Sequence, residues 1–146
     1  MTTTLAAFAE ASTAILTGLF FTFSVVVMPA LARRPPGEAA AVMIQINRTI
    51  QNPLFLSVFL GAPIAAVVLA VLRDLAVPST VAAGAVVVGS LALTMGVNVP
   101  MNNALDASDP ATEEGRVLWA GYLRRWTGWN HVRAVACLTA SVLYAV

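Results

Sequence analysis

Apolar and small residues fill long stretches of this chain, and polar residues gather in the shorter segments between them. Residues 11–32 contain no charged side chain, and neither do residues 53–72 and 79–98. About 20 such residues in a helix cross the roughly 30 Å hydrocarbon layer of a membrane. We therefore predict three membrane spans, over Leu5–Leu31, Pro53–Leu72 and Ser79–Asn98, and a fourth that ends at Val146.

Prolines set the expected ends of these spans, because proline lacks a backbone donor and clashes with the preceding helical turn. Pro29 and the pair Pro35–Pro36 close the first span, and Pro53 supplies the first turn of the second. Pro100 disfavours helical geometry at Val99. The third span is therefore expected to end or kink there.

Two polar segments are expected to form short amphipathic helices at the membrane surface. Residues 37–52 place Val42, Ile46 and Ile50 opposite a polar side of Gln45, Arg48 and Gln51. The predicted fold is therefore all-α. It is a single domain over residues 1–146, a four-helix transmembrane bundle with two short amphipathic interfacial helices.

The second amphipathic helix leads into the fourth span. Asp109 is expected to cap it, with Pro110 at its first position. Glu113 and Glu114 then fall in the first turn, where negative charge suits the helix dipole.

Arginine placement predicts the orientation in the membrane, because positively charged connections stay in the cytoplasm. The second connection contains only Arg73, whereas the first and third connections, with the helix start that follows, contain the rest: Arg33, Arg34, Arg48, Arg116, Arg124, Arg125 and Arg133. We expect a multi-pass protein of the cell membrane with connections one and three in the cytoplasm and both termini outside.

The composition agrees with a membrane protein and narrows its partners. Hydrophobic residues make up 59% of the chain and charged residues 10%, whereas a soluble domain carries about 25% charged residues. A net charge of +1 predicts no nucleic-acid partner. The first ten residues lack the positive charge of a secretory signal, so we interpret the first apolar run as a retained span.

Metal ligands are scarce in this sequence. Tight transition-metal sites use several His, Cys or carboxylate ligands, and one chain offers only His131, Cys137 and a distant Glu10. We predict no metal and no bound cofactor, although a dimer interface would double the ligands. Glu10 is either a buried proton carrier or a carboxylate near enough to the helix start to reach interfacial water.

The stretch from Trp119 to Arg133 concentrates the unusual side chains of the chain. It holds all three tryptophans, the only histidine and three of the eight arginines. Helical spacing puts Trp126, Asn130, Arg133 and Cys137 on one face. Such a polar face avoids hydrocarbon and should point into the protein. The alternative is an ordinary interfacial belt of aromatic residues, with arginines that reach the lipid headgroups.

Amide side chains from two other segments are expected at the same cytoplasmic end. Asn47 lies in the first connection, and Asn98, Asn102 and Asn103 surround Pro100. Amides, indoles and a guanidinium together suit a flat organic molecule that carries oxygen atoms. The sequence therefore indicates a binding site for a lipophilic phenolic or quinoid compound that enters from the bilayer or the cytoplasm.

Four motifs carry a family resemblance over nearly the whole chain. They are VMPAL, INRTIQNP, NVPMNNAL and LWAGYLRRWTGWNHVR. The chain resembles the small four-helix membrane proteins of the anthrone oxygenase-like family, in which some members oxidise an anthrone to an anthraquinone. The resemblance implies such an activity here, and the matching motif positions are Asn47, Asn98, Pro100, either Asn102 or Asn103, Trp126, Asn130 and Arg133.

The roles expected at this site follow from side-chain chemistry. Arg133 would stabilise an oxyanion, Asn98 and Asn130 would orient the substrate, and His131 would act as base. Dioxygen would be the co-substrate. The remaining candidates would bind the substrate: Asn47, Asn102, Asn103, Trp119, Tyr122, Trp126 and Trp129.

Two functions compete with oxidation of such a compound. In one, the protein is a non-catalytic binding or accessory membrane protein, and the cluster of Asn, Trp and Arg is structural. A transporter is less favoured, because four spans with few intramembrane charges offer little machinery for alternating access. Small residues four positions apart, such as Ala62, Ala66 and Ala70, make a homodimer a further prediction.

Overall fold

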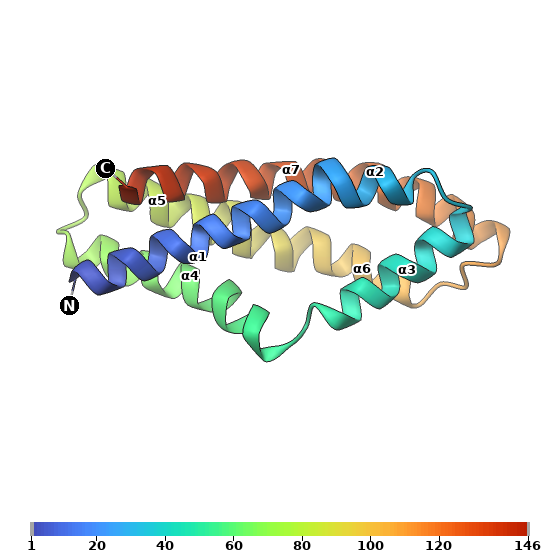
Figure 1. Ribbon diagram of the computed structural model, residues 1–146, viewed down its shortest axis with the longest axis horizontal. Coiled ribbons are helices and arrows are strands. Elements are labelled where there is room, and N and C mark those ends of the chain that lie inside the picture. The colour runs from blue at the N-terminus through green and yellow to red at the C-terminus, as the bar shows by residue number, and fades with distance from the viewer. Residues whose placement is uncertain (1, 146) are drawn as a thin grey trace.

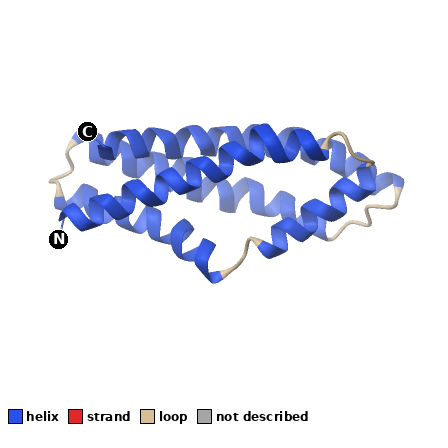
Figure 2. Ribbon diagram, in the orientation of Figure 1, coloured by secondary structure: helices blue, strands red, loops and turns tan. Residues whose placement is uncertain are grey.

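The computed structural model describes residues 2–145, and within them every regular element is helical, as the apolar pattern predicts. Short loops join the helices (Figure 2). In chain order the elements are α1 (Thr2–Thr22), η1 (Phe23–Val27), α2 (Met28–Leu31), α3 (Pro36–Thr49), α4 (Pro53–Leu72), α5 (Val77–Val86), η2 (Val87–Ala92), η3 (Thr94–Asn98), α6 (Val99–Asp106) and α7 (Glu113–Ala145), where η marks a π-helical turn.

Among residues 2–145, three helical segments are long and apolar enough to cross a membrane: Thr2–Leu31, Pro53–Leu72 and Val77–Asp106. The three uncharged runs thus form helices of the predicted length and apolar character. Helix α7 is the longest helix, with 33 residues, but its apolar half also contains Asn130, His131 and Arg133.

The helix does not end at Val99, which rules out one of the two outcomes expected at Pro100, an end or a kink. The Val99 N–H reaches back five residues to the Thr94 carbonyl, and the helix continues to Asp106. A matching π turn precedes Pro29, where the Met28 N–H bonds to the Phe23 carbonyl. Each π turn carries an extra residue, and this local change of register lets the helix pass its proline.

The long helices pack side by side, with α1 against α4 and α7 and α5 against the same two helices (Figure 1). Small residues bring them close. Ala62 and Ala66 are fully buried within one chain, and a Cβ added at Gly89 would lie 2.4 Å from the Cβ of Ala136. The small-residue faces thus serve contacts within the chain, and a homodimer stays a prediction.

Helix α3 packs against α6 and α7 at the other end of the molecule. Its buried face consists of Ala39, Ala40, Met43 and Asn47, whereas Val42, expected on the apolar side, is exposed. Small residues and a methionine fit closely against the neighbouring helices, and this packing turns the helix away from the face predicted by hydrophobicity alone.

The start of α7 also differs from the prediction. The helix begins at Glu113, and Thr112 caps it by accepting a hydrogen bond from the Gly115 N–H at 3.1 Å. Asp109 instead accepts from the Ala111 N–H within the preceding turn. Thr112 holds the capping position because the turn at Asp109 and Pro110 closes before the helix starts. Glu113 and Glu114 do occupy the first turn, as predicted.

Helix α4 begins away from the rest of the bundle. Asn52 caps it by accepting from the Phe55 N–H at 3.0 Å, and Pro53 is its first residue, as predicted. From that point α4 runs inward to join α1 and α5, while α6 lies apart from its first turns (Figure 1). The start of α1 and the end of α7 lie near each other at the opposite end of the molecule (Figure 1).

Candidate functional site

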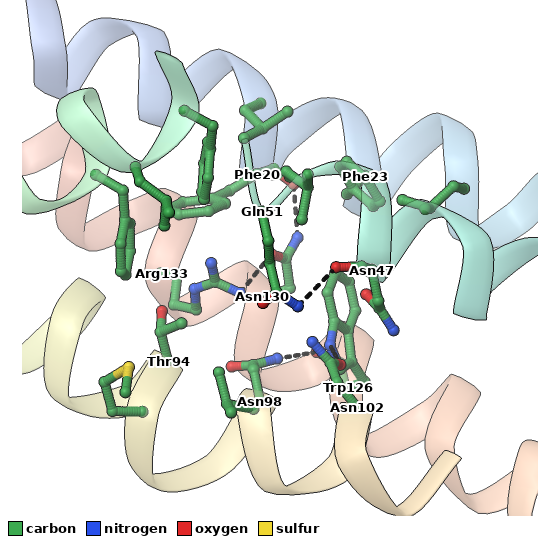
Figure 3. A pocket seen from close by; sticks show the side chains of 18 of the residues that line it. Phe20, Phe23, Asn47, Gln51, Thr94, Asn98, Asn102, Trp126, Asn130 and Arg133 are labelled. Atoms are coloured by element: carbon green, nitrogen blue, oxygen red, sulfur yellow. Dashed lines mark hydrogen bonds between the residues drawn. The ribbon is translucent and has the colours of Figure 1, made fainter. Parts of the chain in front are cut away.

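A cavity of about 290 Å³ lies between the start of α4 and the helices α1, η3, α6 and α7. Ligand pockets span about 300–1,000 Å³, so this volume suits a small organic molecule. Its walls mix aromatic and aliphatic side chains with amides and one guanidinium (Figure 3). The amide, hydroxyl and guanidinium side chains that line it are Asn47, Gln51, Thr94, Asn98, Asn102, Asn103, Asn130 and Arg133.

Arg133 is the only charged side chain in the described wall of this cavity. It is 5% exposed, and within residues 2–145 no carboxylate forms an ion pair with it. Its Nη1 donates to the Asn130 Oδ1 at 3.4 Å, and its Nε has no partner among the described residues.

The Phe20 ring gives Arg133 further electrostatic support. The guanidinium carbon lies 3.8 Å from the ring centroid. A cation–π contact contributes about 0.5–2 kcal/mol, whereas a buried charge without a counter-ion costs several kcal/mol. The cavity therefore presents a cation that an anionic ligand would neutralise.

Asn130 joins α7 to the π turn of α1. Its Nδ2 donates to the Phe20 carbonyl at 2.6 Å and to the Ser24 Oγ at 2.7 Å, and its Oδ1 faces Arg133 (Figure 3). With both amide protons used inside the protein, Asn130 holds the guanidinium in place and offers little to a ligand.

Asn98 has a free acceptor in the buried wall. The residue is 1% exposed; its Nδ2 donates to the Trp126 carbonyl at 3.5 Å, and its Oδ1 has no partner among residues 2–145. A buried acceptor without a donor costs about 1–3 kcal/mol. A ligand with an O–H group would satisfy it.

Asn102 anchors an aromatic network beside the cavity. Its Oδ1 accepts from the Tyr122 hydroxyl at 2.9 Å and from the Trp126 Nε1 at 2.8 Å, and the Asn47 Nδ2 donates to the same hydroxyl at 3.4 Å. The Tyr122 hydroxyl therefore both donates, to Asn102, and accepts, from Asn47.

The structure brings together seven of the predicted site residues in the cavity wall: Asn47, Asn98, Asn102, Asn103, Trp126, Asn130 and Arg133. Trp119 and Tyr122 lie behind this wall in a stack with Trp126, with ring centroids 5.6 and 6.0 Å apart along the stack. Trp129 is 39% exposed on the outer side of α7.

His131 does not line the cavity. It lies in a shallow groove between α2 and α7, next to Pro29 and Arg124. Helical geometry explains this placement, because a residue that directly follows Asn130 points about 100° away from it. The described wall of the cavity thus contains no His, Cys, Asp or Glu.

Sequence reasoning missed the phenylalanines of the wall. Phe20 of α1 and Phe23 of η1 line one side, and Phe55 and Phe59 line it from α4. Their spacings of three and four residues place each pair on one helix face, which is the signal that could have identified them. Gln51, beside the capping Asn52, was also missed.

Among the described residues, no three His, Cys, Asp or Glu side chains lie close enough together to hold a metal ion. Glu10 is half-buried near the start of α1 and does not line the cavity.

Within residues 2–145, the fold and the cavity define a class: an all-α protein with helices apolar enough to cross a membrane and a polar and aromatic cavity that contains the buried Arg133. The sequence model of one protein family, described as anthrone oxygenase, matches residues 46–143. The chain belongs to this anthrone oxygenase family, as its motifs predict. No curated protein and no solved structure matches it.

Proposed function

We propose that this protein is a membrane oxidoreductase that oxidises a lipophilic, anthrone-like phenol with dioxygen in the cavity beside Arg133. The observation that carries the proposal is the buried guanidinium with no carboxylate partner among the described residues. Such a group favours a ligand that is, or becomes, an oxyanion. The family membership supports the same substrate class.

The proposed protein is a four-helix transmembrane bundle in which α7 is the fourth span and α3 and α6 lie near the membrane surface. Connections one and three face the cytoplasm, and both termini face outside. The position of α1's start and α7's finish at one end of the molecule supports this topology.

The reaction needs only the substrate and dioxygen to balance. The methylene carbon of the anthrone loses a proton to give the enolate, whose oxygen Arg133 stabilises. The enolate passes one electron to dioxygen, and the resulting radical pair forms a carbon–oxygen bond, which takes up a proton as a hydroperoxide. The hydroperoxide then loses water and leaves a carbonyl group. One anthrone and one dioxygen thus give one anthraquinone and one water.

The cavity residues divide this work. Arg133 stabilises the enolate oxygen, the Asn98 Oδ1 accepts from a phenolic O–H, and the rings of Phe20, Phe55 and Trp126 contact the faces of the substrate. Because His131 lies outside the cavity, it has no part in this mechanism, and water takes the substrate proton. The proposal involves no bound cofactor and no metal ion, and elemental analysis of the purified protein checks for zinc, iron or copper.

The experiment that tests the function compares wild type, Arg133→Lys and Asn130→Ala in detergent with 1,8-dihydroxyanthrone. Lysine keeps the charge but lacks the planar fork of arginine. We expect binding and turnover to fall by about one to two orders of magnitude in Arg133→Lys, equivalent to about 1.4–3 kcal/mol. Wild-type levels of both in the two variants would remove this face of α7 from the site.

A binding or accessory role is the second candidate, and the hydrogen bonds of the Asn102 Oδ1 and the Asn130 Nδ2 within the protein favour it. In that case the polar cluster holds the helices together. Arg133→Lys and Asn130→Ala would then lower the thermal stability and ligand binding in parallel, and wild-type protein would bind the phenol without forming a quinone.

A further inference from the structure

The cavity has an apolar mouth between two helices that are apolar enough to cross a membrane. Leu56 on α4 and Met95 on η3 both line the cavity, yet they are 37% and 57% exposed on the surface of the molecule. A side chain that is both exposed and part of the wall marks an opening. This opening therefore lies between α4 and η3.

The path of α4 creates this mouth. Helix α4 packs along α1, α5 and η2, whereas η3 and α6 pack against α7. The first turns of α4 therefore lie apart from the helix that contains η3 and α6 (Figure 1). Phe55 and Phe59 form the inner wall of the cavity behind the opening.

The surroundings of the mouth match lipid better than water. Leu54, Leu60 and Ile64 continue the exposed surface of α4, and both helices belong to segments apolar enough to cross a membrane. Exposed leucines and isoleucines in such numbers need an apolar environment. Among the described lining residues, the exposed polar side chains are Gln51 and Asn103, and they mark the polar end of the opening.

We propose that the substrate enters from the lipid bilayer through the gap between Leu56 and Met95, as an uncharged flat polycyclic phenol. This inference rests on the proposed function and narrows its substrate to compounds dissolved in the membrane. A charged molecule avoids the hydrocarbon layer, so the substrate ionises only inside, where its proton passes to water at the Gln51 end and its anion pairs with Arg133.

The test measures association of 1,8-dihydroxyanthrone with the protein in lipid nanodiscs by stopped-flow fluorescence. The double variant Leu56→Trp with Met95→Trp fills the mouth, and we expect the association rate to fall about tenfold or more. The matched control Leu60→Trp with Val88→Trp adds the same bulk at exposed positions outside the cavity, and the rate should stay within about twofold of wild type.

A variant that widens the mouth distinguishes a blocked entrance from misfolding, because misfolding would not raise the association rate. Leu56→Ala with Met95→Ala should raise the association rate by at least about twofold. If Gln51→Trp slows association and the double variant Leu56→Trp with Met95→Trp does not, the entrance lies at the polar end and the proposal is wrong.

A second measurement separates this inference from the proposed reaction. Phosphatidylcholine with a diazirine on an acyl chain should label Leu56, Met95 and the inner Phe59 after irradiation, and peptide mass spectrometry locates the labels. Labels at Phe59 in a protein that forms no quinone would support the portal and contradict the oxidation. Labels only on the outer residues Leu60 and Ile64 would overturn the portal.

Discussion

The two ends of the helical assembly differ in how the helices meet. At the end near the start of α1, alanines such as Ala62 and Ala66, with Cys137 and Ala140 of α7, fill a continuous apolar core. At the other end, amides, indoles and Arg133 replace the small residues, and a cavity opens. The same helices thus form a closely packed half and a half that is open to a ligand.

This difference shows how one set of helices can serve two needs. Small residues allow backbones to approach and gain dispersion contacts without any polar group. The polar half needs partners for every buried amide and charge, and it leaves the Arg133 Nε and the Asn98 Oδ1 without one among the described residues. In the closely packed half, the unpartnered groups are two hydroxyls, of Ser90 and Tyr144. Stability is concentrated in the first half and binding capacity in the second.

The largest effect is expected in the closely packed half. Gly89→Leu would force a side chain onto Ala136, because even a Cβ would lie 2.4 Å from the Ala136 Cβ. We expect the free energy of unfolding to fall by about 3 kcal/mol, the upper part of the usual range for overpacking. Thermal unfolding in detergent measures it. Gly84→Leu, which has open space at its Cβ, is the control and should unfold near the wild-type temperature.

Arg133→Met, in the open half, should raise the free energy of unfolding, whereas Gly89→Leu lowers it. Methionine removes the buried charge and keeps an unbranched side chain, and apolar replacement of whole buried ion pairs often stabilises proteins by about 1–4 kcal/mol. The ligand-free variant should therefore unfold at a higher temperature than wild type and bind 1,8-dihydroxyanthrone at least tenfold more weakly. A lower unfolding temperature would show that Arg133 supports the fold.

Asn102→Ala should destabilise the aromatic network. The change leaves the Tyr122 hydroxyl and the Trp126 N–H without their shared acceptor, which costs about 1–3 kcal/mol in unfolding free energy. Asn103→Ala, at the exposed neighbouring position, should change stability by less than about 0.5 kcal/mol. Equal unfolding temperatures for the two variants would argue against the network.

The smallest effect concerns the connection between α4 and α5. Leu75 is exposed and has a φ of 55°, a left-handed conformation that a leucine adopts at a cost of about 1–2 kcal/mol. Leu75→Gly should raise the unfolding free energy by about 1 kcal/mol. Val71→Gly, in the last turns of α4, should lower it by a similar amount. A drop in both variants would contradict this explanation.

Several parts of the fold follow from local sequence alone. Uncharged runs reveal three spans, and the spacing of Trp126, Asn130 and Arg133 reveals their shared buried face, because both depend only on helical periodicity. Pro100 predicts an end or a kink at Val99, but local sequence does not show that a π turn carries the helix past the proline. The cap at Thr112 was missed because Asp109 has the same capping ability and only the closed turn decides between them.

The cavity is harder to predict, because it depends on the relative positions of helices. The amides were found from their unusual density, but His131 was included for its chemistry and lies on another face of α7. Phe55 and Phe59 look like ordinary apolar residues of a span. They line the cavity because the first turns of α4 lie apart from η3.

The unpaired guanidinium also provides a route to the natural ligand without any knowledge of the reaction. A compound that binds only the folded protein raises its stability by about 2.7 kcal/mol at one hundred times its dissociation constant. A collection of membrane extracts, fractionated and screened for a rise in melting temperature, would reveal such a compound. Fractions that protect wild type but not Arg133→Met would contain the molecule whose oxygen completes the site.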